Sequence, residues 1–177
     1  MGCKAQRATA QMIAGGIGIG RIDHALCPRA AQKLIDSGCI VIAAAGNAGR
    51  TSTWWVGHPA RCPGFMAVAA VDQRKRKASF SSWGPPFLGP QRGIEISAPG
   101  VSINSTVPGG GYGKKSGTSM ACPHVSGAAA LLKQLHPTWT PEKIRKRLND
   151  TADDLGVPGD DPKYGNGLLN CHRAVFG

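Results

Sequence analysis

The sequence predicts an α/β domain with a parallel sheet, and two stretches of the chain carry this prediction. Residues 39–45 form an apolar run of strand length that ends in the turn at residues 46–49. A strand without alternating polar residues is buried on both faces, as strands of parallel sheets are. Residues 119–135 follow a loop of small residues and form an apolar helix. At 177 residues the chain has the length of one domain and is long enough to bury a core.

Three helices are predicted, at residues 25–37, from Ser119 to roughly residue 135, and after Thr140-Pro141. The third has the clearest start, because a threonine caps a helix well and proline is favoured at the first helical position. Aliphatic side chains of the second and third helices are expected in the core. These are Leu131, Leu132, Leu135, Ile144 and Leu148.

Ser119 lies at the start of the second helix, within the stretch SGTSMACPHVSG at residues 116–127. The amino end of a helix carries unpaired N–H groups and about half a positive charge. A serine hydroxyl there can attack a carbonyl carbon while a nearby N–H binds the charge that develops on oxygen. Gly117 allows close approach of a substrate backbone. The pattern indicates a catalytic nucleophile; the alternative is a buried serine at a helix cap.

The stretch at residues 116–127 closely resembles the nucleophile signature of the subtilases, the subtilisin-like serine proteases. The sequence AAAGN at residues 43–47 resembles a second segment of that family. The resemblance implies that Asn47 is the oxyanion donor. It also implies that Ala44, Ala45 and Gly46 form one wall of the primary specificity pocket and that Gly57 belongs to the substrate-binding site. An isolated Gly-Asn turn most often has only a conformational role, so the assignment of Asn47 depends on its pairing with Ser119.

Further segments resemble the same family and define the extent of the match. They are residues 58–60, 65–72 (the next strand), 78–84, 96–101 and 164–170. The resemblance implies the C-terminal part of a largely parallel sheet with helices on both faces, whose N-terminal strands are missing. We therefore expect a poorly matched leader at residues 1–20 and a partial subtilase catalytic domain at residues 21–177. Residues 17–20 are interpreted as a degenerate pocket-lining turn or, alternatively, as part of a flexible leader.

The Asp and His of the family triad are not found in this sequence. A serine hydroxyl needs a general base, and that base needs an orienting carboxylate. In subtilases both precede the segment that contains the oxyanion asparagine, and the chain is expected to begin where that half ends. The five histidines are His24, His58, His124, His136 and His172, and we expect none of them beside Ser119. The resemblance thus implies a serine endopeptidase acting on peptides or proteins; the alternative is an inactive fragment or pseudoenzyme that binds peptides or a partner, such as the missing N-terminal half.

Charge and cysteine content exclude several other classes of protein. The net charge is +11, with basic clusters at residues 74–77 and 143–147, yet no stacking motif accompanies them. We interpret the charge as solvated surface and expect no nucleic-acid partner. Six cysteines occur without a C-x-x-C pair, which argues against zinc. Cys39 and Cys122 are expected to be free thiols, whereas disulfides among the other cysteines remain open.

The family habit implies an extracellular or secretory location, although no signal peptide or membrane span is recognisable in the sequence. No cofactor is expected to be required. The resemblance allows a structural calcium or monovalent cation bound by backbone carbonyls of residues 60–65 with Glu95. We interpret Glu95 itself as an ordinary surface carboxylate, with the cation ligand as the alternative.

Overall fold

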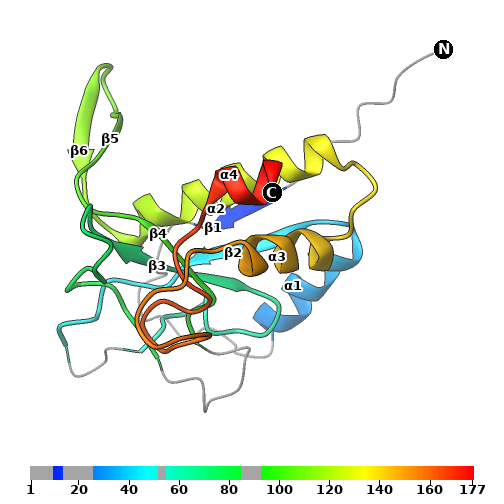
Figure 1. The fold of residues 1–177 in the computed structure, drawn as a ribbon, viewed down its shortest axis with the longest axis horizontal. Helices are drawn as coiled ribbons and strands as arrows, with labels where there is room; N and C mark the ends of the chain where they lie inside the picture. The colour runs from blue at the N-terminus through cyan, green and yellow to red at the C-terminus, as the bar shows by residue number, and fades with distance from the viewer. Residues whose placement is uncertain (1–9, 14–25, 52–54, 85–92) are drawn as a thin grey trace.

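A four-stranded parallel sheet forms the centre of the part of the chain that the computed structural model describes, namely residues 10–13, 26–51, 55–84 and 93–177 (Figure 1). The strands lie in chain order: β1 (Ala10–Ile13), β2 (Ile40–Ala44), β3 (Met66–Val71) and β4 (Ile96–Pro99). In the register of the sheet, Met12 lies opposite Ile42, Ile42 opposite Met66 and Val68 opposite Ile96. All four carboxyl ends therefore lie at one edge of the sheet.

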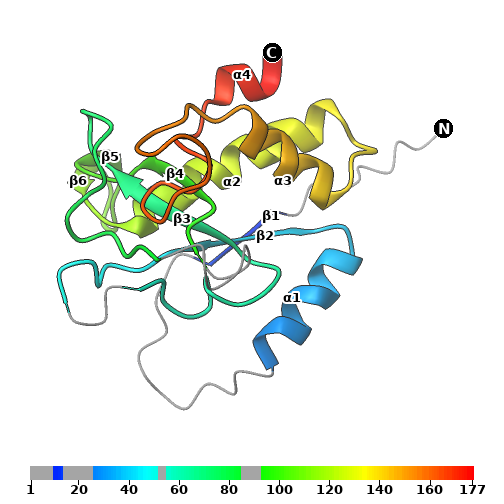
Figure 2. The same cartoon turned by 60° about the horizontal axis from the view of Figure 1, so that its bottom comes forward.

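Helices cover both faces of this sheet, as Figure 2 shows. On one face lies α1 (Leu26–Asp36), and on the other lie α2 (Thr118–Leu135) and α3 (Pro141–Asp150), with the short α4 (Cys171–Phe176) beside them. Alternate strand residues enter two separate apolar clusters. Ile42, for example, packs in the cluster that includes α2 and α3, whereas Val41 packs in the cluster that includes α1. The predicted α/β class with a doubly covered parallel sheet is confirmed.

An antiparallel hairpin of β5 (Ile103–Thr106) and β6 (Tyr112–Lys115) connects the sheet to α2. The hairpin projects from the body of the protein (Figure 1), and most of its residues are exposed. Its second strand ends three residues before α2 begins. The hairpin therefore leads directly to Ser119.

The prediction that Leu131 and Leu135 belong to the core is wrong. Leu132, Ile144 and Leu148 are buried as expected, but Leu131 is 50% exposed and Leu135 is 52% exposed. Residues four apart share one face of a helix, so Leu131 and Leu135 project together, away from the buried face that holds Leu132. The third helix begins as predicted, because the Thr140 hydroxyl accepts a hydrogen bond from the Lys143 N–H at 3.3 Å, with Pro141 in the first turn.

The segment expected to be a poorly matched leader, residues 1–20, contains β1, which pairs with β2 along its whole length. Residues 17–20 and His24 lie outside the described residues. No described helix is long and apolar enough to cross a membrane.

Candidate active site

The candidate site forms where β2 ends and α2 begins. The backbone of β2 continues through Ala45, whose N–H donates to the carbonyl of Val68 at 3.0 Å, and then turns at Gly46 with a φ of +106°. This φ lies in the region that favours glycine. A Cβ at Gly46 would also stand only 3.1 Å from Ser82 Oγ. The turn at Gly46 therefore places Asn47 at the carboxyl edge of the sheet, where α/β folds build their sites.

Asn47 is held against the first residue of α2. Its Oδ1 accepts hydrogen bonds from the Thr118 N–H at 3.0 Å and from the Thr118 hydroxyl at 3.1 Å. The Thr118 hydroxyl in turn accepts from the Gly46 N–H at 3.1 Å. Because a backbone N–H can only donate, the amide atom that faces Thr118 must be the oxygen. The Nδ2 group of Asn47, an exposed residue, is therefore directed away from Thr118 and can donate to a ligand.

Ser119 is the second residue of α2 and is half-buried. The residue before the helix, Gly117, offers no side chain to cap the first turn. Within the described residues, neither the N–H nor the hydroxyl of Ser119 has a hydrogen-bond partner. Both groups are thus available at a helix end that favours negative charge.

The two candidate oxyanion donors are the Asn47 side-chain amide and the Ser119 backbone N–H, and both lie near Gly117. From the position that a Cβ on Gly117 would take, Asn47 Nδ2 lies 3.4 Å away and the Ser119 backbone nitrogen 3.8 Å away. The structure thus brings together the two residues that the sequence singles out. Two nitrogens near one point can donate to a single substrate oxygen, which is the arrangement that stabilises a tetrahedral intermediate.

Close packing fixes the start of α2 on the sheet. The Gly117 N–H donates to the carbonyl of Gly100, which follows β4, at 2.8 Å. A Cβ at Gly100 would stand 2.6 Å from the Cβ of Ala70 and 2.9 Å from the Gly117 carbonyl oxygen. Only a glycine at position 100 permits this approach, so the loop after β4 positions the start of α2, and with it Ser119, relative to the strands.

The residues assigned to the pocket wall form one continuous piece of backbone. Ala44 ends β2, and the carbonyl of Ala45 accepts from the Gly57 N–H at 2.8 Å. The carbonyl of Gly46 accepts from the Ser82 N–H at 2.9 Å. Gly57 therefore lies beside Ala45, as a shared role in substrate binding requires. Their assignment to substrate remains a prediction.

No described histidine forms a hydrogen bond to Ser119. Their contacts lie elsewhere: His58 is beside Cys62, His124 Nδ1 donates to the carbonyl of Met120 at 2.9 Å, His136 stacks on Trp139, and His172 is beside Phe176. His136 follows the last residue of α2, a helix of 18 residues, and so lies at the far end from Ser119. A general base is thus not found in the described part of the chain.

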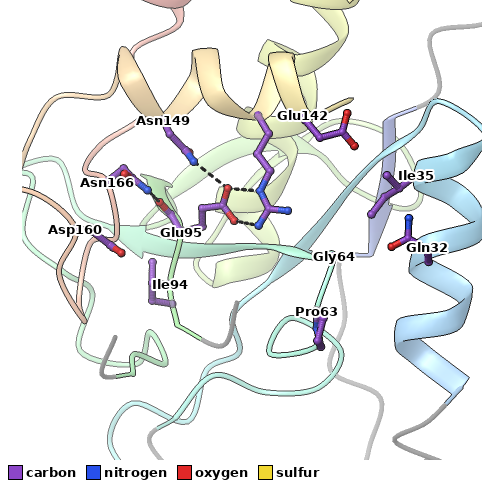
Figure 3. A pocket seen from close by; sticks show the side chains of 11 residues that line it. Gln32, Ile35, Pro63, Gly64, Ile94, Glu95, Glu142, Asn149, Asp160 and Asn166 are labelled. Atoms are coloured by element: carbon purple, nitrogen blue, oxygen red, sulfur yellow. Dashed lines mark hydrogen bonds and ion pairs between the residues drawn. The ribbon is translucent and has the colours of Figure 1, made fainter. Parts of the chain in front are cut away.

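An ion pair between Glu95 and Arg145 lies in the region where a cation was expected, and the cation itself stays a prediction (Figure 3). Glu95 is 9% exposed, so its interpretation as a surface carboxylate is wrong. Its carboxylate accepts from the Arg145 guanidinium and, at 2.9 Å, from Asn149 Nδ2, while Arg145 also lies 3.4 Å from the Phe65 carbonyl oxygen. Arg145 therefore supplies the positive charge at this carboxylate. Among the described residues, no three His, Cys, Asp or Glu side chains gather to hold a metal.

Thr118 has no role predicted from the sequence, although this residue orients Asn47 by two hydrogen bonds. The position of Thr118, between Gly117 and Ser119, is the one feature of the sequence that could have indicated this role. The Thr118 hydroxyl accepts from Gly46 and donates to Asn47, which lie 72 and 71 residues earlier in the sequence, so only the folded chain reveals these contacts.

The fold and site define an α/β protein with a serine at a helix N-terminus beside an oriented asparagine, and comparison with known proteins shows its family. Residues 16–167 match the subtilase family. The chain is 50% identical over 146 residues to a thermostable alkaline protease of Halalkalibacterium halodurans, covering 82% of this chain and 37% of that protein. It is also 50% identical over 145 residues to a subtilisin of Bacillus pumilus, covering 81% and 49%. The chain belongs to the subtilase family of serine proteases.

A solved structure agrees with this assignment. Sphericase superposes with a TM-score of 0.79 at 33% identity, over 91% of this chain and 57% of that one. The chain spans less than half the length of the curated relatives just described.

Proposed function

We propose that this chain carries the nucleophile and the oxyanion-binding groups of a subtilisin-type serine endopeptidase. Ser119 Oγ attacks the carbonyl carbon of a peptide bond, and the oxygen that becomes negative accepts hydrogen bonds from Asn47 Nδ2 and from the Ser119 N–H. The observation that supports this proposal most directly is the double hydrogen bond from Thr118 to Asn47 Oδ1, because it aims the amide donor before substrate binds.

The proposed substrate is a peptide or protein whose side chain packs against one wall of backbone. The wall consists of residues 44–46 and Gly57, which carry only methyl groups or hydrogen as side chains. Small side chains leave room for a substrate side chain, and the wall offers no charge to bind one of opposite sign. The chemistry is ordinary acyl transfer and draws on no cofactor.

The described residues do not supply the proton acceptor that the reaction needs. We therefore propose that the chain alone is inactive. In subtilisin, the enzyme from which the value comes, loss of the base lowers kcat about a millionfold. The groups that remain there still accelerate hydrolysis roughly a thousandfold over water.

A polypeptide that carries an Asp–His pair is the partner this site requires. Two features of the described chain suit such a partner. β1 is one of the two edge strands of the described sheet, and Leu131 and Leu135 of α2 are half exposed. An added segment can extend the sheet at β1 and cover the two leucines. We propose an extracellular setting for the assembled protease, following the habit of the family.

A second function follows if no such partner exists. The chain would then act only by binding peptides at the Asn47–Ser119 edge. The observation that favours it is the engagement of each described histidine away from Ser119.

Peptide hydrolysis by the purified chain, compared with Ser119→Ala, tests the proposal. We expect no hydrolysis above the variant for the chain alone. We expect Ser119-dependent hydrolysis when the Asp–His half of a related subtilase is added. Hydrolysis by the chain alone that disappears in Ser119→Ala would reveal a base within it and contradict the inactivity. Hydrolysis that persists in Ser119→Ala indicates a contaminating protease and is removed by further purification before the comparison is repeated.

A further inference from the structure

Ser82 binds the turn that carries Asn47 on both sides of that residue. The Ser82 N–H donates to the Gly46 carbonyl at 2.9 Å, and the Ser82 hydroxyl oxygen accepts from the Ala48 N–H at 3.1 Å. These two backbone groups belong to the residues immediately before and after Asn47. Ser82 is fully buried, so the two bonds lie where hydrogen bonds are electrostatically strongest. Ser82 thus fixes the backbone from which the Asn47 amide projects.

The two segments also fit closely against each other. The Gly49 N–H donates to the Phe80 carbonyl at 2.8 Å. A Cβ at Gly49 would stand 2.2 Å from the Ser81 carbonyl oxygen, and one at Gly46 would stand 3.1 Å from Ser82 Oγ. A side chain at either glycine would therefore push the segments apart. The turn at residues 46–49 keeps its place only while residues 80–82 keep theirs.

We propose that Ser82 is a positioning residue for the oxyanion donor, an inference that rests on the proposed function of Asn47. Thr118 holds the side chain of Asn47 at Oδ1, whereas the Ser82 hydroxyl holds its backbone through the Ala48 N–H. Because Ser82 is fully buried, it acts through Asn47 and not by contact with substrate. Donors that are fixed before the reaction stabilise the oxyanion without reorganising. A looser turn therefore weakens this stabilisation although both donors remain.

Ser82→Ala isolates the hydroxyl. The variant leaves the Ala48 N–H without its described acceptor, while the Ser82 N–H and its bond to the Gly46 carbonyl are retained. The bond between Gly49 and Phe80 is retained as well. The change therefore loosens the turn beside Asn47 without removing the turn.

Ser97→Ala is the matched control. Ser97 is also fully buried, and its hydroxyl donates to the Tyr164 carbonyl at 3.1 Å. Each variant removes one buried hydroxyl and one hydrogen bond, so the two should lose similar amounts of stability. Ser97 lies on β4 and has no described hydrogen bond to residues 46–49. A difference between the variants therefore reports on the turn and not on general destabilisation.

The test measures two rates in the folded full-length chain. Hydrogen exchange of the Ala48 amide, followed by NMR, should become about tenfold faster in Ser82→Ala and stay unchanged in Ser97→Ala. Labelling of Ser119 by a fluorophosphonate, with imidazole added as the external base, should slow about three- to tenfold in Ser82→Ala alone. An unchanged labelling rate in Ser82→Ala, or equal losses in both variants, would overturn the proposal.

A double variant separates positioning from a merely structural effect. In Asn47→Ala no amide remains to be positioned, so adding Ser82→Ala should cause no further loss of labelling rate. A further loss as large as that in the unaltered chain would contradict action through Asn47. If Asn47→Ala by itself labels as fast as the unaltered chain, the proposed function fails; if it labels slowly while Ser82→Ala does not, only the role of Ser82 fails.

Ser82→Cys extends the test if Ser82→Ala does not fold. It keeps a side chain of similar shape whose sulfur is only a weak acceptor. The same slowing of Ser119 labelling and the same dependence on Asn47 are expected. A folded Ser82→Cys chain that labels as fast as the unaltered chain would overturn the proposal.

Discussion

Removal of the Arg145 side chain should destabilise the fold far more than removal of its neighbour on the same helix. In Arg145→Met the Glu95 carboxylate, 9% exposed, keeps only the Asn149 amide as a described side-chain donor. Breaking a buried ion pair by removing one partner costs about 3–5 kcal/mol. The Arg145 side chain is 28% exposed, so we expect the lower end, about 3 kcal/mol. With a urea m-value of about 2 kcal/mol/M, the midpoint should fall by about 1.5 M.

Lys146→Met is the matched control. Lys146 pairs with Asp150 at 2.6 Å on the same helix, but the two side chains are 75% and 54% exposed. Such a pair contributes about 0.5 kcal/mol or less. Urea unfolding followed by tryptophan fluorescence measures both variants. Equal midpoint shifts for Arg145→Met and Lys146→Met would refute the reasoning that burial, and not charge pairing itself, sets the cost.

Three further changes test separate parts of the structure. In urea unfolding, Leu132→Ala should destabilise the chain by about 3 kcal/mol, because this side chain is fully buried. Leu131→Ala should cost less than about 1 kcal/mol, because its side chain is half exposed. Similar losses of stability in the two variants would contradict the assignment of the buried face of α2. The Asn170 amide and, to a smaller extent, the Arg173 guanidinium lower the pKa of Asp153. The ionised Asp153 carboxylate therefore stabilises the fold at pH values above its ordinary pKa of about 4. This stabilisation is lost as the pH falls through the lower pKa that Asp153 has in the folded state. Asp153→Asn should therefore reduce the loss of stability on acidification, and an unchanged acid profile would count against this. Thr118→Val should slow fluorophosphonate labelling of Ser119 about tenfold, the effect of one ordinary hydrogen bond, and an unchanged rate would show that the Thr118 hydroxyl does not help to orient Asn47.

The parts of the site that were predictable are those carried by local sequence. The stretch around Ser119 and the AAAGN segment each form one loop and the end of one element, so their residue types indicate both the structure and the chemistry. The helix cap at Thr140 was predictable for the same reason. In each case the local conformation depends on residues that are only a few positions away in the sequence.

The parts that were missed depend on contacts between distant segments. Glu95 was not recognisable as buried, because its partner Arg145 lies 50 residues further along the chain. α2 is apolar on more than one side, so its composition does not show that Leu131 is exposed and Leu132 buried. β1 is a four-residue strand, AQMI, which is too short for its pattern to be distinctive and is defined by its pairing with β2.

The pairing of Ser119 with Asn47 is tested most directly by the rate at which a fluorophosphonate labels Ser119 when imidazole is added as an external base. If the nucleophile and oxyanion donors are in place and only the base is lacking, labelling of the chain is slow and rises with imidazole concentration. Asn47→Ala should then reduce the imidazole-dependent rate by about 10²–10³, the range known for the oxyanion asparagine of subtilisin. Labelling that does not respond to imidazole, or that is the same in Asn47→Ala, would contradict the proposed pairing of Ser119 and Asn47.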